Sequence, residues 1–133
     1  MKPEEKKAKA EFSRYVRLRD CMNTTGSLEY GKCFTCGKIV SFEASQCGHF
    51  VSGRSNSLFF VPNNSRMQCP ECNTNKGGNL EVYEERLTNE IGAENVDKLK
   101  QLRHKTKRMY KDDYLMLCTK YKRATRKLTE ESF

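Results

Sequence analysis

Four cysteines occur as two Cys-x-x-Cys pairs, the residue type and spacing of a structural zinc site. Cys33 and Cys36 form the first pair, Cys69 and Cys72 form the second, and 32 residues separate the two pairs. Thiolates at this spacing bind Zn²⁺ tetrahedrally, and four of them leave no coordination position open for chemistry. The sequence therefore predicts a structural zinc ion, and any reaction must be carried out by other residues.

Three polar residues inside or directly after this zinc segment are candidates for catalysis: His49, Asn64 and Asn73. A neutral imidazole is a suitable general base near neutral pH, so His49 is the candidate that activates water. The amide oxygen of Asn73 is a suitable ligand for Mg²⁺. Asn64, with Asn63 as its alternative in register, is better suited to holding the loop or orienting the strand that carries His49. A base beside a hard cation predicts phosphodiester hydrolysis, whereas a packed histidine and two turn asparagines would be the purely structural interpretation.

The charge of the chain is concentrated toward its C-terminus. The net charge is +8, and residues 101–127 contain ten basic and two acidic side chains. Such a tract predicts a polyanionic partner, here DNA, although a solvated helix face is the alternative interpretation. The candidate phosphate-binding residues, each with ordinary surface charge as its alternative, are Arg54, Arg66, Lys76, Lys105, Lys107 and Arg108.

Composition favours a zinc-dependent fold in a reducing compartment. Leu, Ile, Val and Phe together account for 25 of 133 residues, which is few for a self-sufficient apolar core. We expect the central segment to depend on zinc for folding. The N-terminal residues have no apolar signal segment, and the longest apolar run, residues 114–118, is far too short to span a membrane. Paired Cys-x-x-Cys knuckles in such a chain favour thiolates on metal in the cytoplasm, with no membrane partner.

Periodicity predicts an α+β fold that is mostly helical, with an N-terminal helix, a zinc-clipped core and basic C-terminal helices. Apolar residues recur at helical spacing in residues 4–22, 79–91, 94–104 and 112–128. Residues 39–42 and 47–51 suit the two strands of a hairpin, followed by a loop over 52–64 and a short helix that begins at the second knuckle. We therefore divide the chain into residues 1–32 (N-terminal basic helix and linker), 33–79 (a strand–strand–helix zinc core) and 80–133 (a helical extension that is basic at 103–127).

The motifs of the central segment resemble those of a known nuclease group. They are Gly-His-Phe at residues 48–50, Gln-Cys-Pro-Glu-Cys-Asn at 68–73 and Lys-Gly-Gly-Asn-Leu at 76–80. Together with the first knuckle, they resemble the HNH branch of the ββα-metal nucleases. More closely, they resemble the phage lambda NinG (Rap) recombination protein family, over roughly residues 10–128.

This resemblance implies a phage-encoded endonuclease, acting in the bacterial host cytoplasm on branched intermediates such as Holliday junctions and D-loops. It implies His49 as general base, Asn64 as the middle motif residue and Asn73 as a ligand of catalytic Mg²⁺, or of Mn²⁺ in its place. Resolving a four-way junction needs two symmetric cuts, so a homodimer is expected. Two alternatives remain: an HNH nicking or restriction-type endonuclease on ordinary duplex DNA, and a zinc-organised DNA-binding module without catalysis.

One position departs from the broader HNH pattern. Many HNH enzymes carry Asp or His immediately before the catalytic histidine as a second metal ligand, whereas this chain has Gly48. The third motif position is also Asn rather than His. Asn73 is thus the single protein ligand expected from the motif, with waters and phosphate completing the shell, and nothing in the spacing shows that the nearby Gln46 or Glu71 contributes another.

Overall fold

The computed structural model describes residues 1–52, 56–105 and 107–131, and over these the chain is mostly helical with four short strands. The mostly helical α+β class predicted from the sequence is confirmed. The elements follow in the order α1 (Pro3–Thr25), β1 (Tyr30–Lys32), β2 (Ile39–Ser41), β3 (Gln46–His49), α2 (Asn56–Phe59), η1 (Pro62–Asn64), β4 (Ser65–Gln68), η2 (Glu71–Asn75), α3 (Leu80–Ile91), α4 (Ala93–Leu102) and α5 (Lys111–Glu131).

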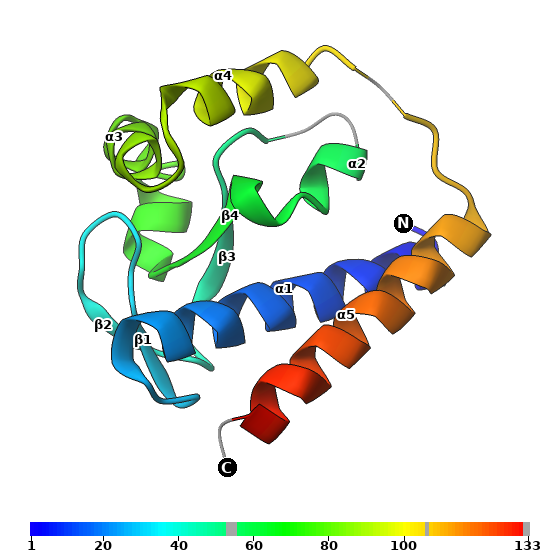
Figure 1. Ribbon diagram of the computed structural model, residues 1–133, viewed down its shortest axis with the longest axis horizontal. Helices are drawn as coiled ribbons and strands as arrows, with labels where there is room; N and C mark the ends of the chain where they lie inside the picture. The colour runs from blue at the N-terminus through cyan, green and yellow to red at the C-terminus, as the bar shows by residue number, and fades with distance from the viewer. Residues whose placement is uncertain (53–55, 106, 132–133) are drawn as a thin grey trace.

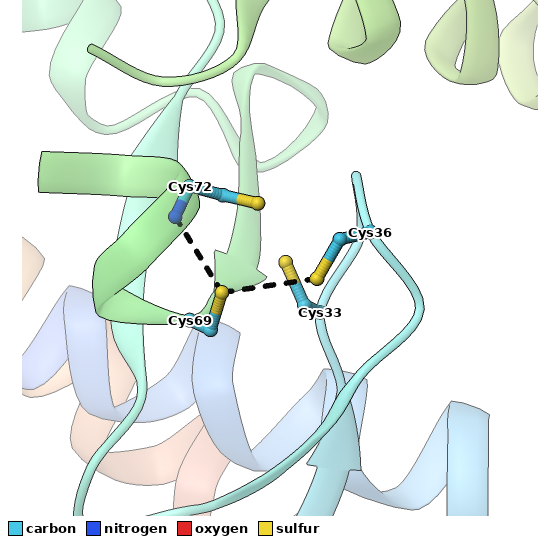
Figure 2. Close-up of side chains that lie close together, drawn as sticks. All are labelled: Cys33, Cys36, Cys69 and Cys72. Carbon is cyan, nitrogen blue, oxygen red and sulfur yellow. Dashed lines mark hydrogen bonds between the residues drawn. The ribbon is translucent and has the colours of Figure 1, made fainter. Parts of the chain in front are cut away.

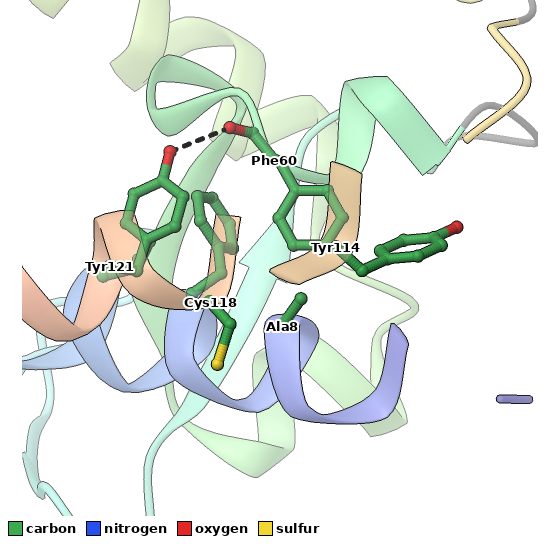
Figure 3. Packing of buried hydrophobic residues seen from close by; sticks show 7 residues of the cluster. Ala8, Phe60, Tyr114, Cys118 and Tyr121 are labelled. Atoms are coloured by element: carbon green, nitrogen blue, oxygen red, sulfur yellow. Dashed lines mark hydrogen bonds between the residues drawn. The ribbon is translucent and has the colours of Figure 1, made fainter. Parts of the chain in front are cut away.

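The first and last helices pack side by side in parallel, so the two ends of the chain share one core (Figure 1). The hydroxyl of Tyr114 donates to Glu5 near the start of both helices, and one turn or two further on the Phe12 and Tyr121 rings meet edge to face at 4.9 Å. Tyr121 also donates to the Phe60 carbonyl at 3.2 Å, which ties this helix pair to the segment after β3 (Figure 3). These aromatic rings belong to a buried core that joins α1, α5 and Phe60.

The strands form two separate antiparallel pairs. β1 pairs with β2, and β3 pairs with β4 in a register that sets Gln46 opposite Gln68 and His49 opposite Ser65. The predicted hairpin between residues 39–42 and 47–51 is therefore wrong, although both ranges contain strands. The reason is tertiary: the carboxylate of Asp20 on α1 accepts the Met67 N–H at 2.7 Å and holds β4 beside β3. The strand–strand–helix order expected for residues 33–79 is made by β3, β4 and the single π-helical turn η2.

Helices α3 and α4 pack on the segment that follows β3. Their apolar faces pack on Phe50, Val51 and Leu58, and the buried Tyr83 hydroxyl donates to the Gly48 carbonyl at 2.8 Å. Gly92 separates the two helices with a φ of 89°, a conformation that suits glycine. In the described parts of the chain, none of the helices has the length and apolar character needed to cross a membrane.

Candidate functional site

The four cysteines of the two knuckles converge into one cluster. Their Sγ atoms all lie within 4.8 Å of one another, and those of Cys36 and Cys69 are 3.8 Å apart (Figure 2). A tetrahedral Zn²⁺ with Zn–S bonds of about 2.3 Å requires sulfur–sulfur distances of about 3.8 Å. The cluster therefore fits the predicted structural zinc ion, held between the turn after β1 and the start of η2.

Hydrogen-bond donors surround these sulfur atoms. The hydroxyl of Thr35 lies 3.5 Å from Cys33 Sγ, the Cys72 N–H donates to Cys69 Sγ, and the Asn79 amide donates to Cys72 Sγ. Burial acts to raise the pKa of Cys33, but the hydroxyl of Thr35 and backbone N–H groups outweigh it and lower the pKa to about 6. Burial instead raises the pKa of Cys36 to about 12 and also raises the pKa of Cys69, so of these three thiols Cys33 is the one that its donors hold in the thiolate form that binds zinc.

His49 is half-buried at the end of β3, with one ring nitrogen held. Its Nε2 lies 3.1 Å from the Phe59 carbonyl, and its ring packs on the Phe59 ring at 4.2 Å and lies 6.2 Å from the Phe12 ring. Because a carbonyl oxygen only accepts, Nε2 is the protonated nitrogen in the contact with Phe59. A neutral imidazole held in this tautomer is suited to act as a general base.

The surroundings of His49 also keep its ring neutral. Burial lowers the pKa of His49 below its ordinary value of 6.5, and the Lys9 ammonium lowers it further. The backbone carbonyls of Phe59 and Cys47 act in the opposite direction without cancelling the burial. Lys9 lies over the Phe59 ring at 4.9 Å and pairs with Glu5. Sequence reasoning missed this lysine, because nothing distinguishes it from the other lysines of the N-terminal helix.

Asn64 is fully buried, and its amide organises the segment that follows β3. Its Oδ1 accepts the Val51 N–H at 2.9 Å, and its Nδ2 donates to the carbonyls of Val51 and Leu58 at 3.0 and 3.4 Å. The neighbouring Asn63 is exposed. Because Leu58 immediately precedes the residue whose carbonyl holds His49, the geometry of Asn64 is that of a positioning residue.

Asn73 lies on η2, beside the opposite end of β3 from His49. Its Nδ2 donates to Gln46 Oε1 at 2.8 Å, and the neighbouring Thr74 hydroxyl donates to the same oxygen at 2.8 Å. Residues three apart on a strand point to opposite faces, so Gln46 and His49 leave β3 on different sides. The structure thus brings Asn73 to Gln46 and places His49 in a separate packing environment on the same strand.

Gly48 lies where a side chain would have no room. A Cβ atom at this position would be 1.8 Å from Gln68 Oε1 on the paired strand. Gln68 is itself fully buried and donates to the Thr35 hydroxyl at 3.0 Å and to the Gly78 carbonyl at 2.9 Å. Glycine at position 48 is therefore a consequence of how the strand pair packs against the zinc knuckles.

Comparison with known proteins identifies the relatives of the chain. A family model described as Bacteriophage Lambda NinG protein matches residues 2–131. The chain belongs to the NinG family. Over 68 residues it is 37% identical to Protein ninG of Escherichia phage 933W and 35% identical to Protein ninG of Escherichia phage lambda. These matches cover 50% of this chain and 33% of each relative, so the chain spans about a third of the length of the curated relatives it matches. No solved structure matches the chain.

The candidate phosphate-binding residues of this NinG-family chain differ in their exposure to solvent. Arg66 is only 5% exposed, and its guanidinium donates to three backbone carbonyls of η1 and β4 and pairs with Glu90 at 3.0 Å. The Arg66 guanidinium thus binds other parts of the same fold rather than a phosphate. The sequence alone does not show that this arginine is buried. Arg54 lies outside the described residues. The remaining candidates are exposed, one at the end of η2 and three in the connection between α4 and α5: Lys76, Lys105, Lys107 and Arg108.

Proposed function

We propose that this NinG-family chain is a Mg²⁺-dependent, structure-selective DNA endonuclease that hydrolyses phosphodiester bonds in branched recombination intermediates. The observation that carries the proposal is His49, a half-buried neutral imidazole whose Nε2 is held by a backbone carbonyl. The resemblance of the surrounding motifs to HNH nucleases supports the reaction class. The match to phage proteins supports a phage-encoded protein, and in this proposal it acts in the bacterial host cytoplasm on branched recombination intermediates.

In this proposal the chain's own residues activate and position the reactants. The His49 imidazole takes a proton from a water molecule, and the water oxygen attacks phosphorus in line. The bond from phosphorus to the 3′ oxygen breaks, which leaves a 5′-phosphate and a 3′ oxyanion that takes a proton from solvent. Asn73 is the residue that would hold Mg²⁺, and the ion would supply stabilisation of the negative charge that develops during phosphodiester cleavage. Asn64 keeps the Phe59 carbonyl, and through it the His49 ring, in place.

The basic surface supplies affinity for the DNA backbone. Exposed lysines and arginines lie in the connection after α4 and along the outer side of α5. Contacts to phosphate are independent of sequence and depend on salt, which suits recognition of a branched shape. Two symmetric cuts in a four-way junction require two active sites, so the working form in this proposal is a homodimer.

The experiment compares cleavage of a labelled four-way junction with cleavage of a linear duplex of matched sequence, with Mg²⁺ added or omitted. A strong chelator is avoided because it would also remove structural zinc. We expect Mg²⁺-dependent cutting of the junction by the wild type and by the control variant His104→Ala, and no cutting by His49→Ala. His104 is the second histidine of the chain and is exposed after α4, so it is a matched control.

Two other functions give different results in the same assay. A non-catalytic zinc-organised DNA-binding module is favoured by the packing of His49 against aromatic rings and by the full use of the Asn64 amide in the fold. It predicts a retarded but uncut junction in every lane. An HNH nicking or restriction-type endonuclease predicts equal cutting of junction and linear duplex.

A further inference from the structure

A cleft beside the first zinc knuckle is lined by polar and charged side chains that the proposed reaction does not use. It has a volume of about 440 Å³ and is lined by residues from the end of α1, from β1, from the first knuckle, from β4 and from α3. Neither His49 nor the two rings that pack on it, Phe12 and Phe59, are among its lining residues. The cleft is therefore a site distinct from the candidate general base.

Several charged groups of this cleft are already balanced by other parts of the protein. The Asp20 carboxylate pairs with Arg19 at 2.8 Å and accepts a backbone N–H of β4 at 2.7 Å. Arg66 and Glu90 pair with each other at 3.0 Å. Cys33 is only 2% exposed, and its sulfur belongs to the four-sulfur cluster that fits zinc. The charge that a ligand meets in the cleft is therefore set by the remaining ionisable side chains.

Those remaining side chains are two cations, and two amides lie with them. Lys32 on β1 and Arg86 on α3 are exposed, and neither forms an ion pair with any residue that the structure describes. Asn23 at the end of α1 and Asn89 on α3 are exposed as well. Ammonium, guanidinium and amide groups all donate hydrogen bonds to phosphate oxygens. The cleft thus fits phosphate groups, since two positive charges in it are not neutralised.

The cleft and the basic connection between α4 and α5 lie at opposite ends of α1 (Figure 1). Asn23 is in the last turn of α1, whereas Tyr114 at the start of α5 contacts Glu5 in the first turn. Asn23 and Glu5 are 18 residues apart, which corresponds to about 27 Å of helix at 1.5 Å per residue. The protein therefore has two basic surfaces that are separated by most of the length of its first helix.

We propose that this cleft binds the backbone phosphates of a second DNA arm while the basic connection binds the first, an inference that rests on the proposed function. A branched substrate has arms that point in different directions, so it occupies both surfaces at once. Binding of the second arm is then an intramolecular step, which raises the affinity for branched DNA above that for a linear duplex. Phosphate contacts have no sequence preference of their own, so the spacing of the two surfaces selects the shape of the substrate.

The test measures binding of a labelled four-way junction and of a linear duplex of matched length to the full zinc-loaded chain, without Mg²⁺ so that the DNA stays intact. The double variant Lys32→Ala/Arg86→Ala should weaken junction binding about tenfold and duplex binding less than about twofold. The slope of log affinity against log salt for the junction should fall by about 2, one for each lost phosphate contact.

Two further double variants are the controls. Arg14→Ala/Lys98→Ala also removes one exposed arginine and one exposed lysine, but neither lines the cleft, and both affinities should stay within about twofold of the wild type. Lys32→Arg/Arg86→Lys keeps both charges and should bind the junction as the wild type does. Because all of these side chains are exposed, an unchanged melting temperature and one zinc ion per chain verify the fold.

Three results would overturn the inference. Absence of junction binding by the wild type, or unchanged junction affinity in Lys32→Ala/Arg86→Ala, would show that the cleft does not bind DNA. An equal loss for junction and duplex would show that one duplex contacts both surfaces. Failure here is distinguishable from failure of the nuclease proposal, since junction cutting by the wild type with unchanged affinity in the variant refutes the cleft alone. Junction binding that needs Lys32 and Arg86, without cutting in Mg²⁺, refutes the nuclease alone.

Discussion

Replacing Asn64 by alanine is expected to destabilise the fold strongly, whereas the same change at Asn63 is not. The Asn64 side chain is fully buried and makes three hydrogen bonds to the backbone of Val51 and Leu58. At about 1 kcal/mol of net stability for each bond, the loss is about 3 kcal/mol. For a domain of this size, about 4 °C per kcal/mol gives a melting temperature lower by about 12 °C. Asn63 is exposed, and its replacement should cost less than about 0.5 kcal/mol.

The assay is thermal unfolding of the zinc-loaded wild type and of Asn64→Ala, Asn63→Ala and Asn64→Asp at equal zinc occupancy. Asn64→Asp keeps an acceptor for the Val51 N–H but turns the two donor contacts into contacts between a carboxylate and carbonyls. It should therefore be at least as destabilising as alanine. Equal melting temperatures for Asn64→Ala and Asn63→Ala would refute the positioning role. A stable Asn64→Ala variant without junction cleavage would instead make Asn64 a direct participant in the reaction.

Three further predictions concern zinc, Gly48 and pH. Removing zinc should unfold the segment that contains both knuckles, because the apparent binding energy of such sites in zinc-finger peptides is roughly 10–16 kcal/mol. Circular dichroism and thermal unfolding after metal removal measure this. An unchanged melting curve would contradict the prediction. Gly48→Ala should lower the free energy of unfolding by about 2 kcal/mol, since it displaces Gln68 from two hydrogen bonds. The double variant with Gln68→Ala should lose less stability than the sum of the two single variants. Strictly additive losses would contradict a collision between the two side chains. Because the folded pKa of His49 lies below its ordinary 6.5, the unfolded chain binds the proton first as pH falls. The free energy of unfolding should therefore decline below about pH 6.5, and it should decline less in His49→Gln. The cleavage rate should likewise fall only below that pH, where the His49 base becomes protonated. A pH midpoint of cleavage above 6.5 would exclude His49 as the general base.

Much of the architecture is predictable from local patterns. The helical spacing of Phe12, Val16 and their neighbours indicated α1, and similar spacing indicated α3, α4 and α5. The two Cys-x-x-Cys pairs indicated the sulfur cluster, because their spacing is set by metal geometry rather than by distant parts of the chain. Family membership was likewise readable from the motifs between residues 33 and 80, and the match over residues 2–131 confirms it.

Strand pairing was not predictable, because contacts from another element decide it. The sequence Ser-Arg-Met-Gln of β4 has no apolar alternation, and all four residues are buried. Its position is set by Asp20, which accepts the Met67 N–H, and by Arg19, which donates to the Ser65 carbonyl at 2.8 Å. The internal use of Arg66 was hidden for the same reason, since charge alone gives no indication of burial. The contact between Gln46 and Asn73 joins residues that are 27 positions apart.

The most direct test of the central claim is a single-turnover cleavage assay on a labelled four-way junction with zinc-loaded protein, comparing wild type, His49→Ala and His104→Ala at saturating protein. The account predicts Mg²⁺-dependent cutting by the wild type and by His104→Ala, and intact junction bound at wild-type affinity by His49→Ala. Cutting by His49→Ala at the wild-type rate, or a bound but uncut junction with the wild type, would contradict it.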